Sequence, residues 1–356
     1  MKNTLEFIEA LSNANGVSGF ELAVNQVIRT YLKDEFDLKE DAMGNMLIYN
    51  KAYDSTLKTV MLDGHSDEVG FMIQSIDQNG LLRFIALGGW FSQNVGAHKV
   101  RVLNKFGQYI SGIVTSKPPH FMSESERGKI VEISEMRIDV GTTSYEETVD
   151  LYGIEPGAPV VPEVVFEYNE KSKIMMGKAF DNRLGCALVV ETMKAIKDLK
   201  LKVNVVGAIS TQEEIGTRGS QITSKNINPH VAVVFEGTPA DDPYRGKYER
   251  QGALKDGPQL RHRDNSMVAN PRLIKHAKNV AEALKIPYQN AIRIGGGTDA
   301  GKIHLNNEGV PTIVLGVPVR YAHTHFGISA YKDFEDTLSW SVALMKSFNE
   351  EVINNL

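Results

Sequence analysis

The strongest constraint on the fold is a change in the spacing of hydrophobic residues near residue 69. Between Val69 and about Pro162, short alternating runs such as VGFMIQSI and HKVRVLN are separated by Asn-Gly, Gly-Gly and Phe-Gly turns. Alternation with a period of two, broken by glycine turns, is typical of short antiparallel strands. We therefore predict a small all-β barrel or sandwich over residues 69–162, inserted into a different fold.

On both sides of this segment the chain follows an α/β pattern. The expected strands are 59–62, 203–211, 231–236 and 311–317, and the main expected helices are 184–199 and 271–284. Strands that alternate with helices form a mostly parallel sheet covered on both faces. The sequence therefore predicts an α/β catalytic domain built from residues 1–68 and 163–356. The polar stretch 238–270 is expected to be a long ordered loop over a site.

Charge and composition restrict the partners. The 356 residues carry a net charge of −5. No basic cluster appears, which argues against a nucleic acid or an anionic membrane surface as partner. The first residues contain neither an apolar signal core nor a cleavage site, and no run approaches the roughly 18 apolar residues of a spanning helix. Cys186 is the only cysteine, which excludes an internal disulfide and a thiolate metal cage. We expect a cytosolic protein.

Histidines and acids stand where predicted strands end or where a predicted helix begins. They are His65, Asp67, Asp181, Glu213, Glu214, Glu236 and His323. Open parallel sheets bind their ligands at the carboxyl edge of the strands. We therefore expect these side chains to meet in one site.

Several members of this set have a simpler interpretation when taken singly. His65 and Asp67 fit a polar surface turn as well as a metal ligand with an orienting carboxylate. Taken alone, Asp181 is better interpreted as the N-cap of a helix, although a carboxylate can also bridge two metals about 3.5–4 Å apart. Glu236 fits a salt bridge, and His323 fits an ordinary hydrogen-bonded histidine. The metal interpretation gains its weight from the whole set.

Glu213 and Glu214 are adjacent, which usually indicates a solvated surface. The strand before them is too apolar to lie at the periphery, and Gly216 and Gly219 follow at once. Two neighbouring carboxylates in a cleft can divide the chemistry, because one binds metal while the other accepts a proton from water.

The chain resembles the tetrahedral aminopeptidases, a family of co-catalytic metallopeptidases with glutamyl- and leucyl-specific members and with proteins once labelled endoglucanases. The motifs that carry the resemblance are DVGTTSYEE, DNRLG, TQEEIGTRG, FEGTPADD, GGGTDA and RYAHT. Each motif is weak alone, but the set is highly specific and spans nearly the whole chain. The resemblance implies an aminopeptidase that removes N-terminal residues from short peptides. It also implies a dodecamer built from dimers with the help of the inserted domain.

The resemblance also implies a role for each site residue. One divalent metal would be bound by His65, Asp181 and Glu236, and the other by Asp181, Glu214 and His323. Glu213 would be the general base, and Asp67 would orient His65. Nitrogen and oxygen ligands suit zinc or cobalt, and they also accept manganese. In related enzymes the peptide bond after the bridging aspartate is often cis.

Two positions depart from the usual pattern of the family. Many relatives have Asp where this chain has Glu236, and a longer carboxylate can still reach a metal. HTHFG replaces a more usual His-Ser sequence. His325 would point the same way as His323 if the spacing were strand-like, and it then lines the substrate pocket or has no role.

The segment IGGGTDA lacks the Lys-Ser/Thr of a phosphate-binding loop. We expect it to let the backbone pass close to the substrate, with Thr298 or Asp299 beside it. Cys186 lies among apolar residues of a predicted helix, so burial is a better interpretation than catalysis.

Two other functions compete with the peptidase. A glycoside hydrolase of the endoglucanase type needs two carboxyl groups about 5–10 Å apart and no metal, so the histidines would have no purpose. A scaffold without catalysis would be expected to lose ligands, yet every expected position holds a competent side chain. The side-chain preference stays open, because the sequence indicates neither a basic cluster for acidic residues nor an apolar wall.

Overall fold

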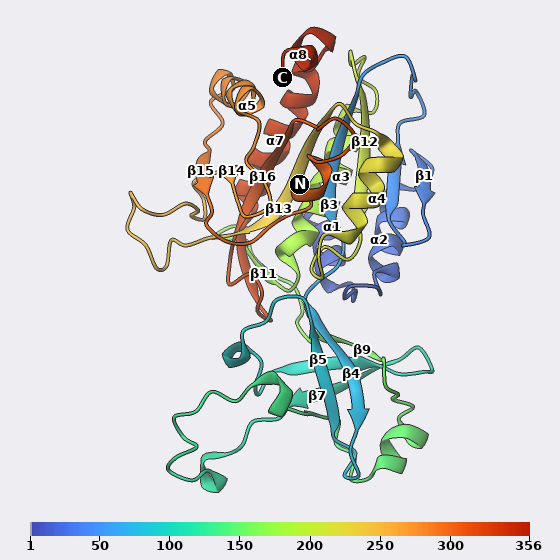
Figure 1. Ribbon diagram of the computed structural model, residues 1–356, viewed down its shortest axis with the longest axis vertical. Helices are drawn as coiled ribbons and strands as arrows, with labels where there is room; N and C mark the ends of the chain where they lie inside the picture. The colour runs from blue at the N-terminus through green and yellow to red at the C-terminus, as the bar shows by residue number, and fades with distance from the viewer. Residues whose placement is uncertain (1) are drawn as a thin grey trace.

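The computed structural model describes residues 2–356, which form two lobes (Figure 1). The upper lobe contains an 11-stranded sheet with helices, and the lower lobe is a closed barrel. Each lobe has a hydrophobic core of its own. Both marked chain ends lie in the upper lobe, so the chain enters the barrel and returns.

Four adjacent parallel strands form the centre of the large sheet. In spatial order they are β12 (Asn204–Ser210), β3 (Thr59–His65), β13 (Val231–Pro239) and β16 (Thr312–Arg320). Antiparallel strands extend both edges: β2 (Met46–Tyr49) and β1 (Asp37–Glu40) on one side, and β17 (Gly327–Ala330), β11 (Ile174–Gly177) and β10 (Glu167–Asn169) on the other. Every residue of β3 and β12 is buried, as expected for strands covered on both faces. The predicted α/β class is confirmed.

Helices cover both faces of this sheet. Their bounds are α1 (Lys2–Asn13), α2 (Leu22–Leu32), α3 (Phe180–Ile196), α4 (Arg218–Ile227), α5 (Pro271–Ala283), α6 (Ala300–Ile303), α7 (Tyr331–Ser347) and α8 (Glu350–Asn354). The central helix α3 packs against β3 and β13 and contacts α1 and α7. On the other face, Ser210 Oγ lies 3.2 Å from Thr223 Oγ1 of α4, and α4 contacts α6.

The lower lobe is built from six short strands. They are β4 (Gly70–Ile76), β5 (Leu82–Leu87), β6 (Lys99–Leu103), β7 (Tyr109–Val114), β8 (Ile138–Asp139) and β9 (Pro159–Pro162). They close in the order β4-β5-β8-β7-β6-β9. Inward-facing residues such as Phe71, Phe84 and Val100 fill the interior, as the alternating pattern of the sequence indicates. Short helical turns at 92–94, 119–121, 133–135 and 147–151 connect the strands.

The stretch 238–270 differs from the predicted long loop, because it contains a strand. β14 (Gln259–Arg263) pairs antiparallel with β16 and parallel with β15 (Gln289–Ile292). Leu260 is fully buried in the core of the upper lobe. Leu260 is flanked by polar residues, so the sequence shows no hydrophobic pattern from which this strand could be predicted. None of the helices over residues 2–356 is long and apolar enough to cross a membrane.

Candidate metal centre

The four central strands deliver side chains to one edge of the sheet. His65 is the last residue of β3, and Glu236 lies near the end of β13. Glu213 and Glu214 follow β12, and His323 lies in the loop after β16. Because these strands are parallel, their carboxyl ends meet. The convergence expected from the sequence therefore exists in the structure.

Asp181 stands between the two histidines. His65 Nε2 lies 3.3 Å from Asp181 Oδ1, and His323 Nε2 lies 3.6 Å from Asp181 Oδ2. His65 Nε2 is also 3.7 Å from Glu236 Oε2 and 3.9 Å from Glu213 Oε2. On the other side, His323 Nε2 is 3.5 Å from Glu214 Oε2. Each oxygen of the Asp181 carboxylate thus faces a different histidine.

The donor set fits divalent cations. Two groups of three side chains each bring their donor atoms within 4.8 Å of one another. One group is His65, Glu213 and Glu236, and the other is His65, Asp181 and Glu214. Within residues 2–356, Glu236 Oε1 is buried and has no hydrogen-bond partner. An unpaired buried carboxylate oxygen is costly, and a cation would satisfy it. Imidazole nitrogens with carboxylate oxygens are suitable ligands for zinc, cobalt or manganese.

The site concentrates negative charge. Burial raises the pKa of Glu213 and that of Glu236 well above the usual range, and it raises the pKa of Glu214 to about 8. Burial also opposes protonation of His65, but nearby carboxylates, Glu213 foremost, outweigh it and raise the pKa of His65. Carboxylates this close favour either protons or cations. A bound cation would relieve the repulsion without protonating the acids.

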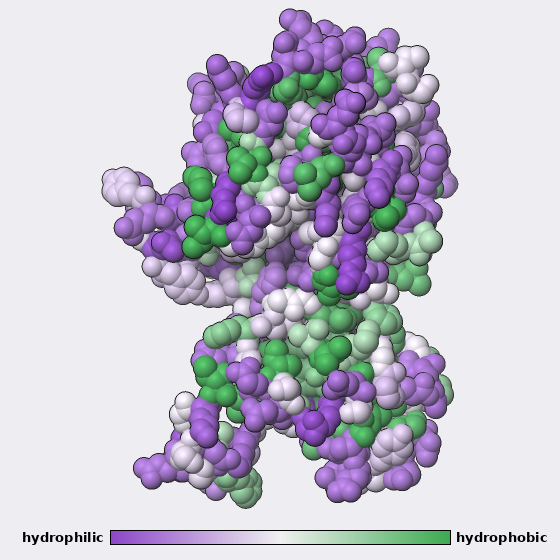
Figure 2. All heavy atoms as spheres, viewed as in Figure 1, coloured by the Kyte–Doolittle hydropathy of each residue, from purple (hydrophilic) through white to green (hydrophobic). Residues whose placement is uncertain are grey.

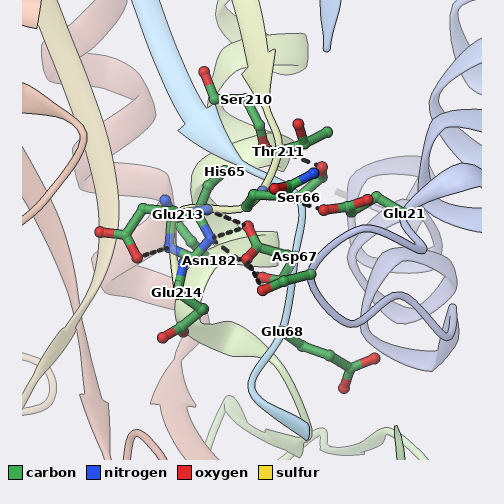
Figure 3. A network of polar contacts seen from close by, with 12 residues as sticks. Glu21, His65, Ser66, Asp67, Glu68, Asn182, Ser210, Thr211, Glu213 and Glu214 are labelled. Atoms are coloured by element: carbon green, nitrogen blue, oxygen red, sulfur yellow. Dashed lines mark hydrogen bonds and ion pairs between the residues drawn. The ribbon is translucent and has the colours of Figure 1, made fainter. Parts of the chain in front are cut away.

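Asp67 organises the residues around His65 (Figure 3). His65 Nδ1 lies 3.4 Å from Asp67 Oδ1 and 3.2 Å from the Asp67 carbonyl oxygen. The buried Asp67 carboxylate accepts hydrogen bonds from the backbone N–H groups of Glu213 at 2.9 Å and Glu214 at 3.1 Å, and from Ser18 Oγ at 2.5 Å. One carboxylate therefore holds the ring of a candidate ligand and the loop that carries two acids.

Asp181 does not serve as a helix cap. No side chain forms a cap at Ala179, and the backbone of Asp181 and Asn182 is not helical. Where the regular helix begins, the Gly185 N–H donates to Asn182 Oδ1 at 3.0 Å, so Asn182 and not Asp181 acts as the cap. The Asp181–Asn182 peptide bond is cis, as the resemblance implies. Asn182 Nδ2 donates to the Phe235 carbonyl at 2.7 Å, which ties this turn to β13. A Cβ at Gly237 would lie 2.3 Å from the Phe180 carbonyl oxygen, so only glycine lets β13 pass this close.

His323 is oriented from the other lobe. Its Nδ1 lies 2.8 Å from the carbonyl oxygen of Gly89, in the loop after β5. Its backbone has φ of 59°, a left-handed conformation that is uncommon for a residue with a side chain. Such outliers are found at functional sites more often than elsewhere.

Comparison with known proteins identifies the group to which this site belongs. The family described as M42 glutamyl aminopeptidase matches residues 44–339. The chain belongs to this family. The M42 chain is 28% identical to the glutamyl aminopeptidase of Lactococcus lactis subsp. cremoris (strain MG1363) over 348 residues, which cover 97% of each protein.

Solved structures agree with the M42 assignment. A TET aminopeptidase from a marine sediment archaeon (Thaumarchaeota archaeon SCGC AB-539-E09) superposes with a TM-score of 0.94 and 37% identity, over 99% of both chains. The TET1 peptidase of Pyrococcus horikoshii, described as assembling into a tetrahedron or a large octahedral shell, has a TM-score of 0.86 and 26% identity, over 97% of this chain and 100% of that one. As an M42 protein, the chain is a metallo-aminopeptidase, which disfavours the glycosidase and the scaffold.

A cleft of about 470 Å³ opens beside the ligand cluster of the M42 site. Thr298, named from the sequence, lines it together with the glycines 295–297. Two arginines, Arg261 and Arg293, line it as well. Sequence reasoning missed them because they are 32 residues apart, with no local cluster, and only the pairing of β14 with β15 brings them together.

Asp299 and His325 do not line this cleft. Asp299 is fully buried and is not part of the cleft lining, and burial followed by repulsion from Asp63 raises its pKa. His325 is turned toward the barrel lobe, where its ring stacks on His98 with 4.0 Å between centroids. Residues 321–325 form a turn with a positive φ at His323, so the two histidines do not share the direction that a strand-like spacing would give them.

Cys186 takes no part in the chemistry of the M42 site. Its Sγ donates to the His65 carbonyl oxygen at 3.0 Å, and burial raises the pKa of the thiol to about 12. A protonated, buried thiol is not a nucleophile. The structure therefore agrees with the interpretation of Cys186 as a packing residue.

Proposed function

We propose that this M42 protein removes the N-terminal residue of short peptides with two divalent cations bound in the cluster. The ligand sets would be His65, Asp181 and Glu236 for one cation, and Asp181, Glu214 and His323 for the other. The observation that carries the proposal is the orientation of the Asp181 carboxylate. One of its oxygens lies 3.3 Å from His65 Nε2, and the other lies 3.6 Å from His323 Nε2. When bound, the cations lower the pKa of water and stabilise negative charge on the peptide oxygen.

Glu213 is the proposed general base. Its side chain lines the cleft, and it belongs to neither ligand set. A raised pKa suits a carboxylate that accepts a proton from the attacking water and returns it to the leaving amine. Asp67 positions this group, because it accepts a hydrogen bond from the Glu213 backbone N–H at 2.9 Å.

The acids at the metal end of the cleft also explain cleavage at the first residue. A free α-amine would lie against a cation or one of these carboxylates. Its position sets the distance from the chain end to the bond that reacts. Because this distance is fixed, only one residue is removed at a time. Peptides without a free amine would lack the contact and would not be cleaved.

We also propose assembly of the chain into a dodecamer built from dimers, with residues 69–162 as the assembly domain. Large apolar side chains are exposed on the barrel lobe, among them Phe121 at 74%, Ile113 at 50% and Ile85 at 44%. Figure 2 shows hydrophobic patches on the visible face of this lobe. Exposed apolar patches mark interaction surfaces. The shells described for the TET1 relative support this proposal, and a cytosolic location would fit short peptides as substrates.

The test is a panel of aminoacyl p-nitroanilides, used with protein that has been stripped of metal and reloaded with zinc, cobalt or manganese in turn. We expect stripping to abolish turnover and zinc or cobalt to restore it. Substrates with an acetylated amine should not react. Full activity of demonstrably metal-free protein would contradict the two-metal proposal. Hydrolysis of cellulose by a chelated sample would support the glycosidase instead.

A further inference from the structure

Two adjacent acids of the metal centre face the same cleft. In a strand, successive side chains point to opposite sides, so Glu213 and Glu214 would separate if β12 continued through them. Both line the cleft because the backbone turns just before them, at Gln212, which has φ of 55°. This left-handed conformation is unfavourable for a residue with a side chain, so contacts around the turn must hold it.

Hydrogen bonds from the loop backbone to two carboxylates hold this turn. The pairing of β12 with β3 ends before the loop, and side chains accept the next N–H groups instead. The Gln212 N–H donates to Glu21 Oε1 at 3.1 Å. The N–H groups of Glu213 and Glu214 donate to the Asp67 carboxylate at 2.9 and 3.1 Å. The bond at the turn itself is therefore the one that Glu21 accepts.

Glu21 reaches this loop from a part of the chain 191 residues away. It immediately precedes α2, and its side chain extends toward the loop from the side of that helix (Figure 3). Its Oε1 also accepts a hydrogen bond from the Gly19 N–H at 2.8 Å. Gly19 has φ of 87°, a conformation that favours glycine, and this tight turn directs the Glu21 carboxylate inward.

The segment that carries Glu21 also contacts the loop after β3. Ser18 Oγ donates to Asp67 Oδ2 at 2.5 Å, and the Glu68 N–H donates to the Gly16 carbonyl oxygen at 2.9 Å. Residues 16–21 therefore connect the loop after β3 with the loop after β12. These are the two loops that carry Asp67 and the adjacent acids.

An acid at position 21 is electrostatically unfavourable. Only 5% of Glu21 is exposed, and burial, followed by repulsion from Asp67, raises its pKa to about 7. A buried acid beside another acid lowers stability unless its hydrogen bonds compensate. Local rules of this kind are broken mainly at functional sites. The placement of Glu21 thus indicates a role in the chemistry of the loop that it holds.

We propose that Glu21 is a positioning residue for the reaction, because it holds the turn at Gln212 that directs the Glu213 side chain into the cleft. This inference rests on the proposed function, in which Glu213 is the general base. Glu21 is not part of the cleft lining, so it acts through the loop and not by contact with the substrate. A general base must stay within hydrogen-bond reach of the attacking water, and a small shift of the loop removes it from that reach.

The first experiment removes the acceptor. Glu21→Ala should lower kcat by about 10- to 100-fold, the usual effect of a misplaced catalytic group. KM and metal content should change little, because Glu213 is a ligand of neither proposed cation. Glu21→Gln keeps an oxygen that can accept both N–H groups, so its kcat should return to near the wild-type value. Equal losses in the two variants would contradict a role that depends on this oxygen.

A double-mutant cycle tests whether Glu21 acts through Glu213. Glu213→Gln alone removes the proton acceptor. If Glu21 only positions that acceptor, then adding Glu21→Ala to Glu213→Gln should cause little further loss of kcat. If the two losses multiply, the proposal is overturned. Loss of metal together with activity in Glu21→Ala would also overturn it, because Glu21 would then support a metal ligand instead of the base.

The matched control is Asp333→Ala. Asp333 lies in the first turn of α7, and it is likewise a buried carboxylate that accepts two backbone N–H groups, from Lys255 at 2.7 Å and Gly257 at 2.9 Å. None of these three residues lines the cleft. Asp333→Ala should therefore lower the melting temperature but leave kcat at the wild-type value. An equal loss of kcat in both alanine variants would reduce Glu21 to a purely structural residue and overturn the proposal.

Melting temperature and metal content are measured for every variant, and kcat is measured below the lowest melting transition. If Glu21→Ala does not fold, Glu21→Met takes its place, because methionine keeps the length of the side chain but offers no strong acceptor. The same loss of kcat is expected for it. Wild-type kcat in folded Glu21→Met protein would overturn the proposal.

The substrate is the p-nitroanilide that wild-type protein cleaves fastest, and the variants separate this inference from the proposed function. If metal-loaded wild-type protein cleaves no aminoacyl substrate, or if Glu213→Gln keeps wild-type kcat, then the proposed function itself is wrong. If Glu213→Gln loses turnover but folded Glu21→Ala does not, then only the inference about Glu21 fails.

Discussion

The carbonyl oxygen of Gly89 lies 2.8 Å from Nδ1 of His323, although the two residues belong to different lobes. When Nδ1 donates its proton to this carbonyl, Nε2 is the unprotonated nitrogen, and it faces Asp181 and Glu214 at 3.6 and 3.5 Å. A backbone acceptor behind a histidine fixes its tautomer and the direction of its ring. The barrel lobe therefore takes part in shaping the candidate metal centre.

This contact predicts that Gly89→Ala weakens metal binding. A Cβ at Gly89 would lie 3.0 Å from His323 Nδ1 and 3.4 Å from its Cε1, so the ring must move. We expect a loss of ~10- to 100-fold in metal affinity, the usual effect of disturbing the partner of a ligating histidine. Competition with a metal-binding dye measures it. Gly96→Ala in the same lobe is the control, because its Cβ would meet only Thr115 at 3.9 Å. Equal affinities of the two variants would contradict the prediction.

Glu213 and Glu214 are predicted to fail in different ways. Glu213→Gln removes only the proton-accepting oxygen, so turnover should fall by ~10²–10⁴-fold with metal content near wild type. Glu214→Gln weakens a charged ligand, so metal and activity should be lost together, with partial rescue by excess metal. Metal stoichiometry and kcat of both purified variants decide the question. Glu213 also lies within ligand distance of His65 and Glu236. If Glu213→Gln loses its metal and Glu214→Gln keeps it, then Glu213 is the ligand and Glu214 the general base.

Asp67→Asn should disturb both the metal site and the fold. The carboxylate accepts three hydrogen bonds, and an amide can replace only part of this capacity while it adds two donors. We expect the free energy of unfolding to fall by about 1–3 kcal/mol and metal affinity to fall by ~10-fold or more. Urea denaturation and dye competition measure the two quantities. Ser18→Ala removes one of the three bonds and is the control, with a loss of about 1 kcal/mol. A variant Asp67→Asn with wild-type metal affinity would be inconsistent with an orienting role.

The thiol of Cys186 should be unreactive in the native protein. Its pKa of about 12 lies far above neutral pH, so at pH 8 only on the order of 10⁻⁴ of it is thiolate. Because burial raises this pKa, lowering the pH suppresses the thiolate further, and reactivity can increase only as the pH rises toward 12. A disulfide reagent should label no cysteine at pH 8 in native protein and one cysteine per chain in denaturant. Rapid native labelling would show that the thiol is accessible.

Most of the candidate metal centre could be predicted from the sequence, because its residues follow strands that can be recognised locally. His65, Glu213 and His323 each come just after a run of apolar residues, and parallel strands must bring such ends to a common edge. The period of the hydrophobic pattern likewise separated the barrel segment from the α/β segments. These features depend on a few neighbouring residues, so the linear sequence is sufficient to find them.

Only the tertiary structure decided the features that depend on distant contacts. Arg261 and Arg293 enter one cleft because β14 and β15 pair, and Gly89 reaches His323 because the two lobes pack together. A short polar strand such as β14 has too weak a pattern to be recognised, and its place in the sheet comes from its bonds to β16. The direction of His325 depends on one positive φ, which no local pattern indicates. The residues of the metal site can be recognised from local sequence, whereas the arginines of the same cleft come from chain segments that meet only after folding.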